Sequence, residues 1–121
     1  MCLRLADEGA NVAVADLRRG PLEGGKPTDE KIEDEGGSAV FLETDVSDEY
    51  SVRSTVQDAV EEFGEVDLLV NNAGVHHSAS VTEETLEGFH EIIDVNLRGT
   101  FLMSKHVLRH MTEQGLEGDV V

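Results

Sequence analysis

Acidic and amide side chains stand directly after three apolar segments of the sequence. Asp16 ends the segment NVAVAD, and Asp45 follows SAVFLE closely. The third segment, VDLLV, runs into Asn-Asn-Ala-Gly at 71–74. Carboxylates accept hydrogen bonds from hydroxyl and amino groups, and a small Ala-Gly step lets a flat ligand lie against bare backbone. The chemistry that suits these residues is the binding of a nucleoside.

The apolar segments have the lengths of short strands, and helical patterns separate them. We expect strands at 11–16, 38–43 and 66–71, with a further strand beginning at DVV, the last three residues. Helices are expected before Gly9, over about 28–35 with Thr28 as N-cap and Gly36 just past the end, from an N-cap at Ser47 to a stop at Gly64, from Thr82 or a neighbour onward, and over about 94–111.

Strands that are apolar throughout and alternate with helices are typical of a parallel sheet covered on both faces. We therefore predict an α/β fold with a doubly wound, Rossmann-like parallel sheet, in one domain over residues 1–121. Ligands of such sheets bind at the carboxyl ends of the strands. This is where the acidic and amide residues are expected to meet.

Each signal also has an ordinary structural explanation. Asp16 could simply end a strand, Asp45 could be a turn residue, and Asn-Ala-Gly could be an ordinary loop. The order and spacing of all three carry more weight than any one of them.

The segments VAVAD, TDVS, DLLVNNAG and DVNLRGTF, in that order, resemble the short-chain dehydrogenase/reductase family. The resemblance extends over essentially all 121 residues. NNAG after a strand, with Val-Asn roughly twenty residues later on a helix, is a specific combination. The family implies an NAD(P)-dependent oxidoreductase that transfers hydride between a nicotinamide cofactor and a small alcohol or carbonyl substrate.

The resemblance also implies roles on the adenosine side. Asp16 is similar to the acid that holds the adenosine ribose and favours NAD over NADP. Asp45 and Val46 resemble the pair that binds adenine, through the carboxylate and the backbone amide. Arg18 and Arg19 could bind a 2′-phosphate if they turned inward, but Asp16 is nearer, so we expect NAD.

Further along the chain, Asn72, Ala73 and Gly74 resemble the stretch that packs along the cofactor, with Asn71 more structural. Asn96 resembles the helix asparagine that holds a proton-relay water beside a catalytic lysine. A buried asparagine must satisfy its amide and its carbonyl, so we expect hydrogen bonds from Asn71 or Asn72 to neighbouring strand ends.

Other motifs of the family are not found in these residues. The glycine-rich TGxxxGxG loop should precede Met1, and the catalytic serine and the Tyr-x-x-x-Lys pair should follow DVV. Tyr50, the only tyrosine, is not followed by such a lysine, because Arg53 and Ser54 stand three and four residues later. We therefore expect a partial domain, truncated at both ends and inactive alone.

A partial domain of this kind would lack the first, central strand of a 3-2-1-4-5 sheet. Its apolar edges should make it weakly stable and prone to associate. The alternative to an enzyme fragment is a non-catalytic nucleotide-binding or subunit-interaction module derived from the same fold.

Histidines invite a metal hypothesis, which the spacing does not favour. His76 and His77 are adjacent on an extended loop and point in opposite directions, so we expect no metal site, although one of them could touch substrate. We expect His106 and His110 at a solvent or subunit surface. By resemblance, the helix over 94–113 forms a homo-oligomer interface. We expect its apolar residues to serve as core and packing surface: Phe101, Met103, Val107, Leu108 and Met111.

The composition excludes several partners. Twenty-six acidic residues against nine basic ones give a net charge of −17, which disfavours nucleic acid and anionic membranes. Cys2 is the single cysteine, and no apolar run approaches the roughly 20 residues of a membrane span. We expect a cytoplasmic protein, and the acidic shell suggests a halophilic one.

Salt should stabilise this protein, because ions screen the repulsion among its acidic side chains. The expected result is a melting temperature that rises between dilute buffer and molar KCl, measured by circular dichroism. A melting temperature that stays constant over this range would contradict the high-salt hypothesis.

Overall fold

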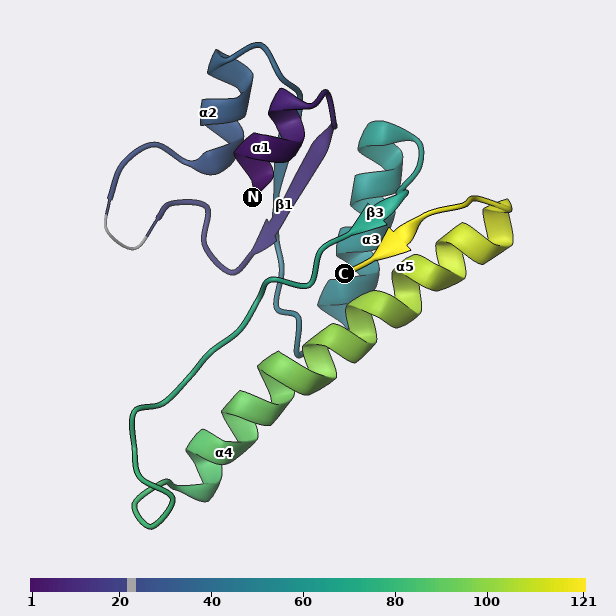
Figure 1. Ribbon diagram of the computed structural model, residues 1–121. Helices are drawn as coiled ribbons and strands as arrows, with labels where there is room; N and C mark the ends of the chain where they lie inside the picture. Colours follow the sequence, from purple (N-terminus) through teal and green to yellow (C-terminus); the bar gives the residue numbers. More distant parts are fainter. Residues whose placement is uncertain (22–23) are drawn as a thin grey trace.

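The computed structural model describes residues 1–21 and 24–121 (Figure 1). Strands and helices alternate along the chain. In order they are α1 (Cys2–Asp7), β1 (Val12–Asp16), α2 (Thr28–Asp34), β2 (Ala39–Glu43), α3 (Glu49–Phe63), β3 (Leu68–Leu69), α4 (Leu86–Ile93), the π-helix η1 (Asp94–Gly99), α5 (Thr100–Gln114) and β4 (Asp119–Val120).

The strands pair in parallel, as two two-stranded sheets. β1 pairs with β2 from Val12 beside Ala39 to Asp16 beside Glu43, and β3 pairs with β4, with Leu68 beside Asp119. In the expected order 3-2-1-4-5, β1 and β2 are strands 2 and 3, and β3 and β4 are strands 4 and 5. The observed pairings are therefore the expected ones. Within the described residues β1 and β3 do not pair with each other, so the two sheets stay separate.

Helices pack against both sheets. α1 and α2 lie against β1 and β2, while α3 packs against α5, and α5 against β3 (Figure 1). α4, η1 and α5 follow one another as a continuous helix over residues 86–114, about 43 Å long at 1.5 Å per residue. This long helix is the element that connects the loop before it to the core.

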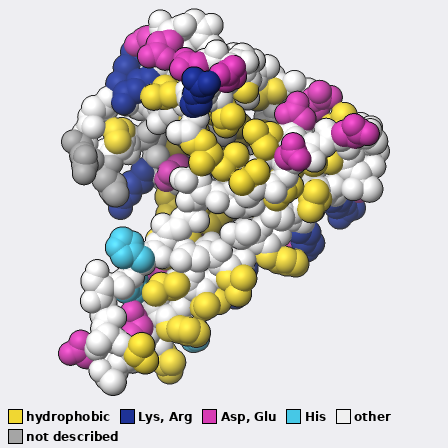
Figure 2. All heavy atoms as spheres, viewed as in Figure 1, with side chains coloured by type: hydrophobic (Ala, Val, Ile, Leu, Met, Phe, Trp, Pro, Cys, Tyr) yellow, Lys and Arg dark blue, Asp and Glu magenta, His cyan; other side chains and the backbone are white. Residues whose placement is uncertain are grey.

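The main core lies between α3, α5 and β3. Figure 2 shows apolar side chains gathered between these elements and the β1–β2 sheet. Deep burial of these side chains supplies most of the driving force for the packing of the two helices. The buried members are Val52, Val56, Leu69, Leu102, Met103, Val107 and Met111. Of the residues expected as core and packing surface, Met103, Val107 and Met111 are in this core, whereas Phe101 and Leu108 are 61% and 47% exposed.

Hydrogen bonds at the helix ends explain where α3 and α4 begin. Ser51 N–H donates to the carboxylate of Asp48 at 2.7 Å, so Asp48 is the N-cap of α3, and the predicted N-cap Ser47 is wrong by one residue. The Thr85 hydroxyl accepts from Gly88 N–H, which starts α4 three residues later than predicted. A turn closed by Ser80 occupies the intervening residues.

Other boundaries differ by small amounts from the sequence predictions. α2 has Pro27 rather than Thr28 as N-cap, and Gly64 ends α3 with φ of 87°, as predicted. The strand expected over 66–71 is assigned as β3 only at Leu68–Leu69, although its backbone hydrogen bonds to the segment 119–121 run from Asp67 to Asn71. No helix in the described part of the chain is long and apolar enough to cross a membrane.

Candidate nucleotide-binding site

The ends of β1 and β2 are joined through the backbone. Thr44 N–H donates to the Asp16 carbonyl at 2.9 Å, so the residues that follow the two strands begin next to each other. Asp16 and Asp45 are both exposed. Two carboxylates therefore stand at the carboxyl edge of this sheet, where solvent or a ligand can reach them.

Asp45 shapes the turn into α3. Its Oδ1 accepts from Ser47 N–H at 2.9 Å and from the Ser47 hydroxyl at 2.6 Å, and its own N–H donates to the Ser51 hydroxyl at 2.9 Å. Asp45 is thus a turn residue, the ordinary explanation that the sequence left open. The two bonds to the carboxylate both use Oδ1, so Oδ2 can still accept from a ligand.

Asn71 fixes the end of β3. Its backbone N–H donates to the Val121 carbonyl at 2.8 Å, and its side-chain amide donates to the same carbonyl and to the Ser104 hydroxyl, both at 3.3 Å. The hydrogen bonds expected from this asparagine pair to a neighbouring strand end are therefore confirmed for Asn71. Asn72, Ala73 and Gly74 follow it in exposed backbone.

Asn96 holds the next residue of this loop from the long helix. Its Oδ1 accepts from Val75 N–H, and its Nδ2 donates to the Val75 carbonyl, both at 2.8 Å. A Cβ on Gly74 would lie 3.4 Å from the same Oδ1, so the loop passes close to the amide. In this arrangement both polar groups of the Asn96 side chain bind backbone, which positions the loop.

A π-helix was not foreseen from the sequence, which predicted one regular helix over 94–111. η1 contains Asn96, and the hydroxyl of Thr100 donates to the Asn96 carbonyl at 2.8 Å. Such wide turns inside helices are frequent at functional sites. Gly99 and Thr100 are therefore site residues that the prediction missed, and a glycine and an asparagine inside a long helical pattern were the available signals.

Gly99 brings η1 against the turn after β2. A Cβ on Gly99 would lie 2.7 Å from Cγ2 and 3.0 Å from Cβ of Val46, and the glycine itself is buried. Only a residue without a side chain permits this approach. η1 thus contacts both the Val46 turn and the Gly74–Val75 loop, and it connects two of the three predicted segments directly.

The assembled site has acceptors at one end and open backbone at the other. Asp16 is linked to the Asp45 turn through Thr44, and Val46 is linked through Gly99 to the helix that carries Asn96. Carboxylates of this kind can accept ribose hydroxyl or adenine amino groups, and the bare backbone can lie along the rest of a nucleotide. The arrangement fits the adenosine part of a dinucleotide.

His77 links the loop after Val75 to the residues just before α4 and to α4 itself through two glutamates. Its Nδ1 lies 3.4 Å from Glu84 Oε2, and its Nε2 lies 3.2 Å from Glu91 Oε2. Gly88 leaves room for the cluster, since a Cβ there would meet Glu84 Oε1 at 2.2 Å. Within the described residues no group of three histidine, cysteine, aspartate or glutamate side chains could hold a metal ion.

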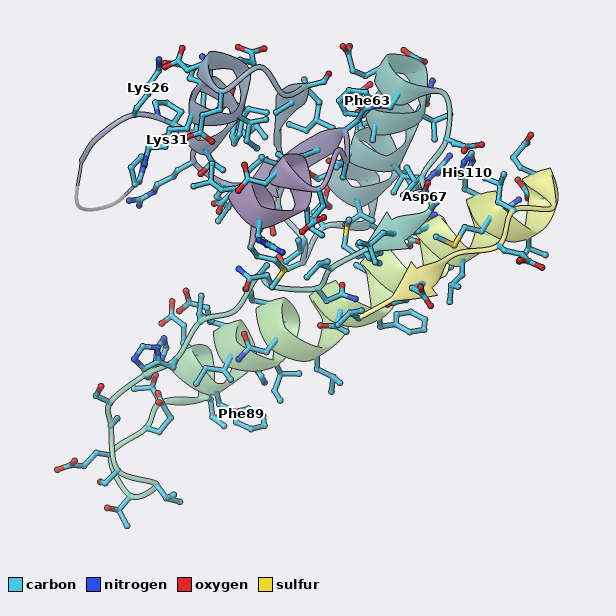
Figure 3. All side chains as sticks on the ribbon, turned by 45° about the horizontal axis from the view of Figure 1, so that its top comes forward. Lys26, Lys31, Phe63, Asp67, Phe89 and His110 are labelled. Atoms are coloured by element: carbon cyan, nitrogen blue, oxygen red, sulfur yellow. The ribbon has the colours of Figure 1, made fainter. Side chains whose placement is uncertain are left out.

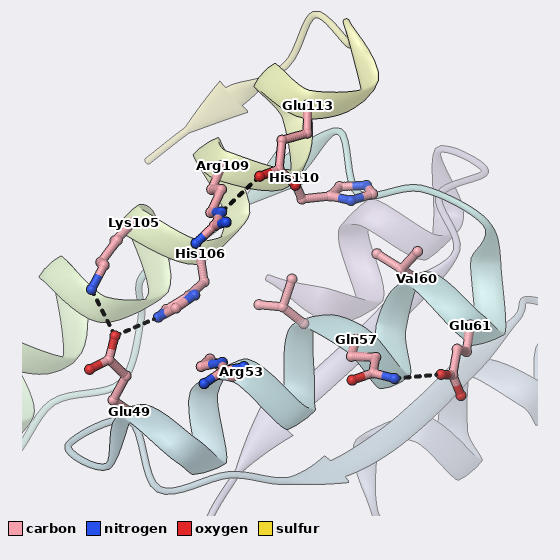
Figure 4. A pocket seen from close by; sticks show the side chains of 11 residues that line it. Glu49, Arg53, Gln57, Val60, Glu61, Lys105, His106, Arg109, His110 and Glu113 are labelled. Carbon is pink, nitrogen blue, oxygen red and sulfur yellow. Dashed lines mark hydrogen bonds and ion pairs between the residues drawn. The ribbon is translucent and has the colours of Figure 1, made fainter.

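The other histidine pair lines a groove of about 660 Å³ between α3 and α5 (Figure 4). His106 Nε2 and Lys105 Nζ lie 3.0 and 2.7 Å from the same oxygen of Glu49. The hydrogen bonds from Lys105 and then His106 lower the pKa of Glu49. The His106 side chain is 11% exposed and lines this groove, so the expectation of a solvent or subunit surface stays a prediction. None of the predicted site residues lines this groove.

Comparison with known proteins identifies the family. The model of the short chain dehydrogenase family matches residues 1–121. Glucose 1-dehydrogenase 2 of Bacillus subtilis (strain 168) is 39% identical over 99 residues, which cover 81% of this chain and 38% of that protein. An uncharacterized oxidoreductase of Thermotoga maritima is 39% identical over 110 residues, 91% of this chain and 42% of its own length. The chain belongs to the short-chain dehydrogenase/reductase family.

Solved structures agree with this assignment. A short chain dehydrogenase from Mycobacterium avium superposes with a TM-score of 0.86 at 31% identity, over 98% of this chain and 45% of that one. A 3-ketoacyl-ACP reductase from Sinorhizobium meliloti 1021 gives 0.87 at 35% identity, over 98% and 46%. The predicted Rossmann-like α/β fold is confirmed, and the chain spans less than half the length of these relatives.

Replacing Gly99 with alanine should destabilise the protein, because the new methyl group would overlap Val46. A better helix former contributes up to about 1 kcal/mol, but overpacking against backbone-anchored atoms costs about 1–3 kcal/mol. We expect a lower urea midpoint for Gly99→Ala. Gly99→Ala should lower the urea midpoint less in a Val46→Ala protein than in the wild type, because the shorter side chain at 46 removes the closest overlap. A Gly99→Ala protein as stable as the wild type would show that the close approach is unimportant.

Proposed function

We propose that the chain supplies the adenosine-binding part of an NAD(P)-dependent oxidoreductase, which transfers hydride between the nicotinamide cofactor and an alcohol or carbonyl substrate. The observation that carries this proposal is the convergence on η1 of the Val46 turn and the Gly74–Val75 loop. The named relatives, a glucose dehydrogenase and a 3-ketoacyl-ACP reductase, support a small-molecule substrate of this class.

NAD is the cofactor that the exposed residues suit best. Asp16 Oδ1 accepts from Arg18 N–H at 3.2 Å, and the carboxylate keeps acceptor capacity for ribose hydroxyls. A negative charge at this place would repel a 2′-phosphate. We propose that Asp16 binds the ribose and that Asp45 and Val46 bind the adenine. Asn72, Ala73 and Gly74 would pack along the rest of the cofactor.

The second candidate is a nucleotide-binding or subunit-interaction module without catalysis. One observation favours it. Asn96, assigned as catalytic by resemblance, uses both groups of its amide to hold Val75. Such a structural role would be useful in a binding module as well, so the presence of Asn96 does not by itself require chemistry.

The working environment that we propose is a cytoplasm of high salt. Support comes from the net charge of −17, which a salty solution would screen, and from the single cysteine, which precludes an internal disulfide.

Replacing Asp16 should weaken NADH binding. The side chain would lose charge-assisted hydrogen bonds to ribose, which are worth about 1.5–3 kcal/mol, or roughly tenfold or more in Kd. We expect Asp16→Ala to raise the Kd in a fluorescence titration with NADH, while Asp58→Ala, the same charge change on an exposed part of α3, should not. An unchanged Kd in Asp16→Ala would refute the proposed ribose contact. Micromolar binding of NADH by the wild type would favour the module, because a fragment of the enzyme is expected to bind poorly.

We further propose that a second copy of the chain covers the long helix. Its exposed apolar side chains are three, four or seven residues apart and so lie along one face, visible around Phe89 in Figure 3 and along the lower edge of Figure 2. A row of this length on a soluble protein is typical of an interaction site. The members are Leu86, Phe89, Ile93, Leu97, Phe101 and Leu108.

A charge in the middle of this row should prevent association. Phe101→Asp would place a carboxylate in the apolar interface, where it could not be solvated. We expect the variant to sediment as a monomer at concentrations where the wild type forms dimers or larger species. Tyr50→Asp, at a side chain that is 79% exposed on α3, is the control and should associate like the wild type. A wild type that remains monomeric would exclude this interface.

A further inference from the structure

Arg19 is held against the start of α2 by two acids. Its Nη2 lies 2.8 Å from Asp29 Oδ2 and 3.4 Å from Glu30 Oε1, and its Nε donates to the same Asp29 oxygen at 3.1 Å. Arg19 follows Asp16 by only three residues. An arginine that is close in sequence to the proposed ribose acid is therefore engaged elsewhere.

Asp29 depends on this arginine. The residue is 4% exposed, and its other oxygen, Oδ1, is buried without a hydrogen-bond partner in the described part of the chain. Burial raises the pKa of Asp29, but the hydrogen bond and the charge of Arg19, together with backbone hydrogen bonds, outweigh burial, and the pKa lies below its usual value. Removing Arg19 would leave a buried carboxylate uncompensated, which is strongly unfavourable.

A second ion pair near α2 is different. Lys26 contacts Asp34, and both side chains are largely in solvent, 41% and 62% exposed. Exposed pairs of this kind hold a side chain weakly. Arg19 is itself 52% exposed, so its pair differs from that of Lys26 in the buried acid, Asp29, whose side chain is only 6% exposed.

We propose that Asp29 is a specificity-determining residue, which keeps Arg19 away from the 2′ position of a bound adenosine cofactor. The proposal rests on the proposed function. A nearby arginine is what accommodates the 2′-phosphate of NADP, through charge-assisted hydrogen bonds. With Arg19 on α2 and Asp16 negative, the site accepts a free 2′-hydroxyl. Asp29 touches no cofactor itself and is a positioning residue that acts through Arg19.

The test compares adenosine with adenosine 2′-phosphate, which differ only in the phosphate. Their affinities for the whole chain are measured by NMR titration, and their ratio is taken for each variant, so weak binding does not prevent the comparison. Asp29→Asn preserves shape but removes the charge that holds Arg19. We expect it to raise the affinity for the 2′-phosphate, relative to adenosine, by about tenfold.

Further variants separate Arg19 from its neighbours. In Asp29→Asn/Arg19→Ala the ratio should return to the wild-type value, which excludes Arg18 as the cause. Arg19→Ala alone should leave the ratio unchanged. Asp34→Asn, the same change at the exposed pair, is the matched control and should also have no effect.

Three results would overturn the proposal. Asp29→Asn could change the ratio no more than Asp34→Asn does, the double variant could keep the increased ratio, or Arg19→Ala alone could lower the affinity for the 2′-phosphate. If Asp29→Asn does not fold, judged by circular dichroism, Glu30→Gln loosens the same arginine from a side chain that is 37% exposed. It should raise the ratio about twofold, and an unchanged ratio would equally overturn the idea.

Failure of the proposed function gives a different result. In that case neither adenosine nor its 2′-phosphate would shift the resonances of residues 16, 45 and 72–74 in any variant. Binding of both ligands with a constant ratio would refute the role of Asp29 alone.

Discussion

The paired hydrogen bonds between Asn96 and the backbone of Val75 connect the two halves of the candidate site. They join a side chain on the long helix to the loop after β3. Both polar groups of one amide are satisfied by one residue, so the geometry allows little freedom. The same π-helix also brings Gly99 against Val46, and Gly74 passes close to the Asn96 amide.

Charge imposes a second constraint on this molecule. Acidic residues outnumber basic ones by 26 to nine. Most of the described lysines and arginines are in ion pairs: Arg4, Arg19, Lys26, Arg98, Lys105 and Arg109. The pairs differ in how deeply they are buried. Asp29 is nearly enclosed, whereas the acids at the candidate site, Asp16 and Asp45, are exposed and contact hydrogen-bond donors of the backbone or of serine rather than cations. Acids available to a ligand are thus distinguished from those that hold the structure.

Much of the fold could be predicted from the sequence, because strand and helix periods differ and glycines mark the ends. The stop of α3 at Gly64 and the parallel pairings are examples. The exact start of α3 could not, since the choice of Asp48 over Ser47 as N-cap depends on the hydrogen bond from Ser51 N–H. For the site, motif order predicted which segments matter. The contacts of Gly99 and the attachment of Arg19 depend on residues far apart in sequence, and no local pattern reports them.

The pairing of β3 with the last residues has a consequence for the order of folding. Asn71 binds Val121, 50 positions later, whereas β1 and β2 are joined by a much shorter stretch of chain. Closing the longer loop costs more conformational entropy, and the contact can form only after the intervening helix is in place. During synthesis the loop that begins at Asn72 would stay unanchored at this end until residue 121 leaves the ribosome. The part of the site at residues 72–74 would therefore become ordered after the part at Asp16 and Asp45.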